Sequence, residues 1–284
     1  MNKITLLINC KDQSGIIAAT TNFILENRGN ITYVDQHVDR QKEVFFMRLE
    51  CNFEVLNLEK KDFINQFNVN VAQVFQMNWK IYDEESTSRM AIFVSKYDHC
   101  LYDILVRYNS GELKVEIPFI VSNHKELESI ADSFNIPFFH VPIKAETREK
   151  AQYKHLELLK KYKVDFIVLA RYMQIIPDGI IASYPSKIIN IHHSFLPAFI
   201  GAKPYHSAFE RGVKIIGATS HYVTTDLDAG PIIEQNVSRV SHFHSISDLI
   251  AKGRDLEKIV LATAIKYHIC HKVMVYENKT VVFS

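Results

Sequence analysis

The stretch Asn190-Ile191-His192-His193-Ser194-Phe195-Leu196-Pro197, followed later by Leu227-Asp228-Ala229-Gly230-Pro231, is the most informative part of this chain. Side chains two apart in a strand point to the same face, so Asn190 and His192 are expected side by side at a strand end. They combine a hydrogen-bond donor with a titratable base. These are two of the three groups that hydrolysis or transfer of an acyl group requires, and Asp228 can supply the third.

The apolar runs around this stretch predict a parallel sheet. Residues 91–94, 119–121, 166–170 and 188–191 are short, continuous and rich in β-formers, which is typical of strands buried on both faces. Amphipathic segments such as 147–162 separate them and predict helices. This alternation indicates a doubly wound, Rossmann-like α/β domain, in which ligands bind at the carboxyl ends of the strands.

The N-terminal third has a different pattern, with the order strand, helix, strand, strand, helix, strand. This is the ferredoxin-like βαββαβ arrangement. The predicted strands are 4–10, 31–38, 44–51 and 70–81, and the predicted helices begin near Ile16 and cover 56–67. The polar segment 84–89 is interpreted as a linker, which gives domains at 1–83 and 90–284. Residues 273–283 predict a terminal hairpin.

Composition narrows the class of protein. The formal net charge of the 284 residues is +1, so no global field favours nucleic acid or an acidic membrane. The four cysteines show no CxxC spacing, so we expect reduced thiols in a cytoplasmic protein and no metal site. Neither a signal peptide nor a membrane-spanning run is expected.

Each candidate residue has an ordinary interpretation when it is taken alone. An asparagine at a strand end is usually a turn residue, a lone histidine is usually a satisfied polar group, and Asp228 is in a natural turn sequence. Taken jointly with the surrounding glycines and prolines, the three favour a catalytic interpretation. His221, near the end of another strand, is a supporting candidate that could equally make an ordinary polar contact.

Residues 190–197, 217–223 and 227–235 together resemble the formyltetrahydrofolate-dependent formyltransferase family, and the similarity covers most of residues 89–284. Within that superfamily the chain most resembles the formyltetrahydrofolate deformylases. His193 replaces a proline that the nucleotide formyltransferases usually have. Residues 95–101 lack the small residues of a phosphate-binding loop. Residues 1–83 resemble an ACT domain, and 199–205 are similar to the deformylase pattern.

The resemblance implies that the chain hydrolyses 10-formyltetrahydrofolate to formate and tetrahydrofolate. It would act on a linear amide without a cofactor, balance one-carbon pools and supply formate for purine synthesis. Asn190 would hold the oxyanion, His192 would exchange protons, and Asp228 would raise the basicity of His192 or orient the attacking water. An alternative that stays open is transfer of the formyl group to an unrecognised acceptor.

The resemblance also assigns binding residues. In the family, backbone groups of the loop that matches residues 171–177 bind the pterin, so the predicted folate contacts are Met173, Gln174, Ile175 and Ile176. The loop 224–228 would close over the other edge through Thr225 and Asp226.

The ACT resemblance implies a small amino-acid effector. Asp12, Gly15 and Ile16 would form the ligand loop, where Gly15 lets the backbone approach a ligand. The rival interpretation is a purely structural domain that assembles a homo-oligomer through its sheet edges.

Overall fold

The computed structural model describes residues 3–53, 59–83, 86–198 and 204–283. The chain divides into two compact units. The first comprises the residues up to Thr87 with His271–Met274 and those from Val281 onward, and the second comprises Ser88–Cys270 with Val275–Thr280. Part of the chain after residue 270 therefore groups with the first unit, although the sequence placed all of it in the second. Residues 84–85 of the predicted linker lie outside the described residues, and its last two residues already belong to a strand.

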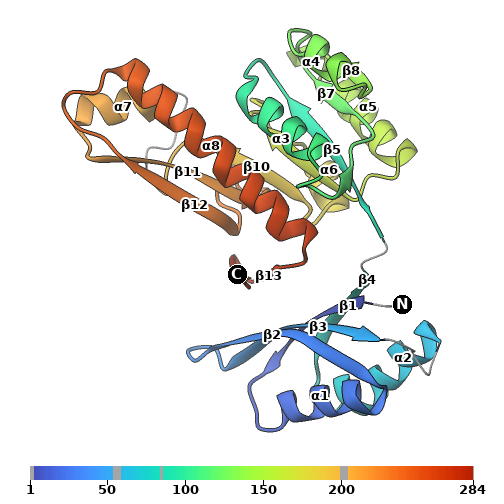
Figure 1. Ribbon diagram of the computed structural model, residues 1–284. Coiled ribbons are helices and arrows are strands. Elements are labelled where there is room, and N and C mark those ends of the chain that lie inside the picture. Colours follow the sequence, from blue (N-terminus) through green and yellow to red (C-terminus); the bar gives the residue numbers. More distant parts are fainter. Residues whose placement is uncertain (1–2, 54–58, 84–85, 199–203, 284) are drawn as a thin grey trace. The chain divides into compact units, whose positions relative to one another are not determined.

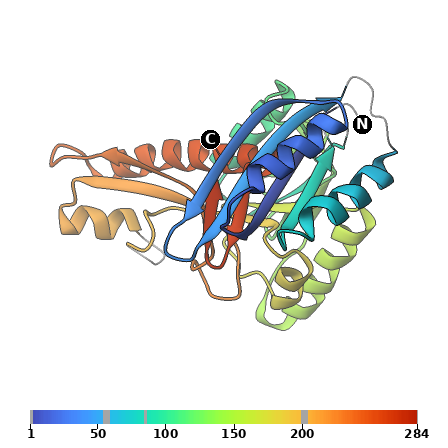
Figure 2. The same cartoon turned by 90° about the horizontal axis from the view of Figure 1, so that it is seen from below.

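The first unit is a four-stranded antiparallel sheet in the order β2-β3-β1-β4. Helices α1 and α2 lie on the same face of this sheet (Figure 1), and Figure 2 shows α1 crossing that face. The elements are β1 (Lys3–Lys11), α1 (Ile16–Glu26), β2 (Gly29–Asp39), β3 (Val44–Phe53), α2 (Lys60–Phe67), the π-helical turn η1 (Asn68–Ala72) and β4 (Asn78–Asp83). The predicted βαββαβ arrangement is confirmed.

The core of this unit follows from period-two alternation along β1. Ile4, Leu6 and Ile8 are fully buried on the face that the helices cover. The rings of Phe23 on α1 and Phe63 on α2 meet there edge to face, with centroids 5.2 Å apart. Aromatic packing between the two helices and the sheet therefore closes the core.

The predicted strand 70–81 is wrong over its first half. Residues 68–72 continue the helical path in η1, and β4 begins only at Asn78. Val71 and Ala72 are buried together with Phe67 of α2, so they extend the apolar stripe of that helix. The start of the predicted helix 56–67 lies partly outside the described residues, and α2 begins at Lys60.

Within the described residues, the second unit has an eight-stranded sheet in the order β12-β11-β10-β9-β5-β7-β8, with β6 pairing beside β5. Its strands are β5 (Ser88–Val94), β6 (Val115–Glu116), β7 (Ile120–Ser122), β8 (Phe138–His140), β9 (Phe166–Ala170), β10 (Ile188–His192), β11 (Ile215–Tyr222) and β12 (Ile232–Arg239). Its helices are α3 (His99–Asn109), α4 (Glu128–Ser133), η2 (Ala145–Thr147), α5 (Arg148–Lys161), α6 (Asp178–Ser183), α7 (Pro204–Arg211) and α8 (Ile246–Ile269).

Helices cover both faces of this sheet. On β9, Ile167 and Leu169 pack into the same buried cluster as Leu158 of α5. The ring of Phe166, which points to the opposite face, lies 4.7 Å from that of His268 on α8. Figure 1 shows α8 running along β10 and β11. The predicted doubly wound domain is confirmed.

The direction of pairing changes at β10. It runs parallel to β9 and antiparallel to β11, where Asn190 pairs with His221 and His192 with Thr219. The register thus brings His221 next to Asn190 at the carboxyl end of β10. The predicted terminal hairpin forms as β13 (Val273–Tyr276) and β14 (Lys279–Val282). Among the described helices, none combines the length and apolar character that a membrane crossing requires.

Candidate active site

A cavity of about 380 Å³ opens at the carboxyl end of β10. Asn190 and His192 both line it, as expected from their spacing along the strand, whereas Ile189 is fully buried. Strand alternation therefore delivers the amide and the imidazole to one cavity.

Asp228 reaches the same cavity from the loop between β11 and β12. Its Oδ2 lies 3.3 Å from Nδ1 of His192, and its Oδ1 lies 3.7 Å from Nε2 of His221. The tertiary structure thus brings together the three predicted catalytic residues and the supporting histidine.

The loop that carries Asp228 is held tightly at its end. A Cβ on Gly230 would lie 1.8 Å from the carbonyl oxygen of Tyr222, so only glycine allows this approach to β11. The Tyr222 amide donates to the Pro231 carbonyl at 2.9 Å, and the Asn278 side chain donates to the Ala229 carbonyl at 2.8 Å. Asp228 itself has a φ of 54°, in the left-handed region. Aspartate adopts this conformation more readily than most residues, so it suits this turn.

The hydrogen bonds of His221 assign its tautomer. Its Nδ1 lies 2.9 Å from the Tyr222 carbonyl oxygen, which can only accept, so Nδ1 carries a proton. In the neutral ring Nε2 is then an acceptor, and it lies 3.2 Å from Nδ2 of Asn190. His221 therefore orients the Asn190 amide with its nitrogen toward β11. Among the described residues the amide donates to no other group, which leaves one N–H for a ligand.

The electrostatics of the cavity keep its carboxylate ionised. The hydrogen bond from His192 is the largest of the influences that hold the pKa of Asp228 well below its ordinary value. Because Nδ1 of His192 faces this carboxylate, the buried Nε2 is the ring nitrogen left to react. It has no partner among the described residues.

A second histidine follows directly. His193 lines the cavity, and its ring lies 5.2 Å from that of His192. Burial, and to a smaller extent the charge of Arg171, lowers the pKa of His193 to about 4. It is therefore neutral near pH 7.

The predicted folate residues come from two segments that line the same cavity. These are Met173, Gln174, Ile175 and Ile176 after β9, and Thr225 and Asp226 before Asp228. The sequence did not single out Asp178 and Ile181 of α6, which also line it. The pair Pro177-Asp178 is a recognisable helix start. This signal could have placed α6, and with it Asp178 and Ile181, beside the loop.

The predicted effector loop lies in the first unit. Gly15 precedes α1 with a φ of 94°, and Ile16 is buried in the core. Asp12 is exposed, and its amide donates to the Glu43 carbonyl at 2.8 Å. Asp12 is thus the member of this set whose side chain remains accessible.

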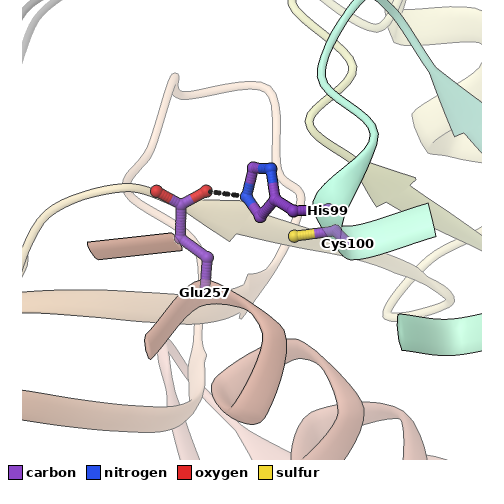
Figure 3. A group of neighbouring side chains, drawn as sticks. All are labelled: His99, Cys100 and Glu257. Atoms are coloured by element: carbon purple, nitrogen blue, oxygen red, sulfur yellow. Dashed lines mark hydrogen bonds and ion pairs between the residues drawn. The ribbon is translucent and has the colours of Figure 1, made fainter. Parts of the chain in front are cut away.

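One further set has the composition of a metal site. Donor atoms of His99, Cys100 and Glu257 lie within 4.8 Å of one another (Figure 3). The guanidinium of Arg171 lies 3.3 Å from the Glu257 oxygen that His99 contacts, and it already supplies the positive charge there. Burial also raises the pKa of the Cys100 thiol well above its ordinary value, which disfavours the thiolate that a metal needs. The chemistry of these residues therefore favours an ion pair between Glu257 and Arg171 over a metal site.

Comparison with known proteins gives matches to both units. The formyl transferase family model matches residues 88–265, and the ACT domain model matches residues 4–61. A formyltetrahydrofolate deformylase of Synechocystis sp. is 50% identical over 99% of this chain and 98% of its own. One from Bacillus subtilis is 46% identical over 100% and 94%. The crystal structure of a formyltetrahydrofolate deformylase from Pseudomonas syringae superposes with a TM-score of 0.96 at 45% identity, covering 100% of this chain and 95% of that one.

Proposed function

Because the chain belongs to the formyltetrahydrofolate deformylase family and is a hydrolase of formyltetrahydrofolate, we propose that the cavity at β10 binds this substrate and that Asn190, His192 and Asp228 hydrolyse it. The observation that carries this assignment is the approach of Asp228 Oδ2 to within 3.3 Å of His192 Nδ1 in that cavity. An oriented base then lies beside an amide donor, which is the arrangement that amide hydrolysis requires.

The pterin of the substrate lies along the loop that follows β9. Met173, Gln174, Ile175 and Ile176 line one side of the cavity, and Thr225 and Asp226 line the other. Side chains of Met173 and Ile175 are partly exposed at 46% and 60%, so apolar surface is available to cover a ring. This placement brings the formyl group, carried on N10, toward His192.

His192 activates the attacking water. Its Nε2 takes a proton from the water as the oxygen attacks the formyl carbon, while Nδ1 stays directed at Asp228. The ionised Asp228 stabilises the imidazolium that forms. The Asn190 amide, oriented by His221, donates its remaining N–H to the tetrahedral oxyanion.

Collapse of the tetrahedral intermediate completes the reaction. The C–N10 bond breaks, and the imidazolium of His192 returns its proton to the leaving nitrogen. Formic acid and tetrahydrofolate leave the site. One water proton has passed through His192 to N10, and the other is released to solvent when formic acid ionises to formate. These reaction steps need no cofactor and no metal ion. We propose that the formyl group removed is the one at position 10 of the folate. The reaction would balance one-carbon pools, and its formate would supply purine synthesis.

Release of formate from 10-formyltetrahydrofolate in the absence of any acceptor tests the assignment. The wild-type protein is expected to release formate and tetrahydrofolate in equal amounts. A protein that releases no formate by itself, and forms tetrahydrofolate and a formylated amine when an amine acceptor is added, would be a transferase and would contradict the hydrolytic mechanism.

For the first unit we propose that the ACT domain binds a small amino acid at the loop of Asp12, Gly15 and Ile16. The family match over residues 4–61 supports this, as does the accessible side chain of Asp12. A thermal-shift measurement with glycine and with methionine tests it. Absence of a shift at saturating concentration of either would favour a structural role in assembly.

We further propose a cytoplasmic homo-oligomer that acts on the folate without nucleic acid or membrane. None of the four cysteines, all of them among the described residues, forms a disulfide, and three are buried, which is consistent with a reducing compartment. The strand β2 lies at an edge of its sheet and offers a place for pairing between subunits. Light scattering of the purified protein measures the assembly.

A further inference from the structure

Behind the cavity lies a buried carboxylate that the hydrolytic mechanism does not use. The Glu257 side chain on α8 is 1% exposed and receives contacts from three separate segments. His99 Nε2 lies 2.8 Å from Oε2 (Figure 3), the Tyr205 hydroxyl donates to Oε1 at 2.7 Å, and Arg171 Nε lies 3.3 Å from Oε2. These contacts come from α3, α7 and the segment after β9. Glu257 thus connects three segments near the active site.

A glycine on α8 leaves room for the contact between Tyr205 and Glu257. A Cβ on Gly253, one turn before Glu257, would lie 2.1 Å from the Tyr205 hydroxyl oxygen. Glycine in the middle of a helix is ordinarily less favourable than alanine. The absence of a side chain here leaves the space through which Tyr205 reaches Glu257.

Arg171 links this carboxylate to the loop that we assign to the pterin. It is the first residue after β9, it lines the cavity, and its φ of 61° lies in the left-handed region. Its guanidinium carbon lies 4.8 Å from the centre of the Tyr97 ring. An arginine rarely adopts this backbone conformation unless its surroundings hold it there. The ion pair with Glu257 provides such a restraint.

The charge state of Glu257 is consistent with this role. Burial alone would raise its pKa, but the hydrogen bond from His99 and the charge of Arg171 outweigh burial and leave the pKa below its ordinary value. The carboxylate is therefore ionised at neutral pH. A buried carboxylate is stable only while its partners stay close to it, so the contacts with Glu257 also hold His99, Tyr205 and Arg171 in place.

A second set of hydrogen bonds holds the segment after β9 two residues further along, at Met173. The Met173 amide donates to Ser95 Oγ at 3.0 Å, and that hydroxyl donates to Asn123 Oδ1 at 2.7 Å. Arg171 and Met173 are thus both attached to buried groups beneath the cavity. The segment between them has little freedom to shift.

We propose that Glu257 is a positioning residue for substrate binding, which acts through Arg171 to hold the start of the folate-binding loop in the conformation that the pterin needs. This inference rests on the assignment of the cavity to folate. Glu257 does not contact the reacting atoms, so its loss should weaken binding of the folate more than it slows the chemical step.

The Glu257→Gln variant tests the inference because it keeps the shape and removes the charge. We expect KM for 10-formyltetrahydrofolate and Kd for tetrahydrofolate to rise about tenfold, with kcat changed by less than about threefold. The matched control is Asp255→Asn on the same helix, where the side chain is 69% exposed. That variant should leave both constants unchanged.

A double-mutant cycle asks whether Glu257 acts through Arg171. If it does, Glu257→Gln combined with Arg171→Gln should bind tetrahydrofolate no more weakly than Arg171→Gln alone. Additive losses would overturn the proposed route. So would a folded Glu257→Gln protein with unchanged KM, or one that loses only kcat.

Tyr205→Phe keeps the test decisive if Glu257→Gln does not fold. It removes one hydrogen bond to the carboxylate and leaves the ion pair in place, so a smaller rise in KM in the same direction is expected. An unchanged KM in that case would refute the inference. The hydrolase assignment fails separately, through absence of formate release by the wild-type protein.

Discussion

Asp228 Oδ2 lies 3.3 Å from Nδ1 of His192, although one residue follows β11 and the other ends β10. Because Asp228 contacts Nδ1, the opposite ring nitrogen of His192, Nε2, is the one left to accept a proton. This Nε2 is buried and has no partner among the described residues. Because Asn190 and His192 share a strand face, this one contact completes the arrangement that we propose to be catalytic.

Replacing Asp228 by asparagine is expected to leave the fold intact and to lower kcat by roughly 1,000- to 10,000-fold, since the amide can no longer stabilise the imidazolium. Formate release measures kcat. Asp226→Asn, two residues away and exposed, is the control and should affect KM rather than kcat. Full turnover by Asp228→Asn would refute the assigned role.

Asn190→Ala removes the proposed donor to the oxyanion. The loss of one such donor typically lowers kcat by about 100- to 1,000-fold, and KM for the folate should change little. Steady-state kinetics separate the two constants. A rise in KM without a fall in kcat would assign Asn190 to substrate binding instead.

His155 should make stability depend on pH. It is 3% exposed, its ring packs 5.1 Å from that of Phe93, and burial lowers its pKa to about 4. The folded protein therefore binds fewer protons than the unfolded chain between pH ~4 and ~6.5, so stability is constant above ~6.5 and falls as pH decreases through this range. This one residue should contribute a loss of about 2 kcal/mol between pH 7 and pH 5.

Urea unfolding of His155→Leu at both pH values isolates that contribution. The difference in unfolding free energy between pH 7 and pH 5 should be smaller than in the wild type by about 2 kcal/mol. His206→Leu, at an exposed position on α7, is the matched control and should keep the wild-type difference. Equal pH dependence in all three proteins would show that His155 does not titrate in this way.

Gly253→Ala should destabilise the protein even though alanine is the better helix former. The added Cβ would displace Tyr205, whose hydroxyl oxygen lies 2.1 Å from its ideal position. Thermal unfolding compares this variant with Arg254→Ala, an exposed neighbour on α8 that should be nearly neutral. Combining Gly253→Ala with Tyr205→Ala should cost less than the sum of the two changes. An additive result would indicate that the two residues do not meet.

Local patterns predicted much of the fold because they are short-range properties. The segment 4–10 and the continuous apolar run 166–170 were correctly predicted as the strands β1 and β9. The same reasoning misplaced the start of β4, where residues 68–72 continue the helical path. A short apolar segment such as Val71-Ala72 suits a strand or a helix equally. Its packing beside Phe67 decides between them.

The sequence by itself determined that Asn190 and His192 share one face, because the two-residue period of a strand requires it. Its motifs also determined the family. Only the tertiary structure decided that Asp228 reaches His192, that His221 orients the Asn190 amide, and that Glu257 lies behind Arg171. These contacts join residues from different strands, loops and helices. Their distances depend on how the elements pack, which no local period encodes.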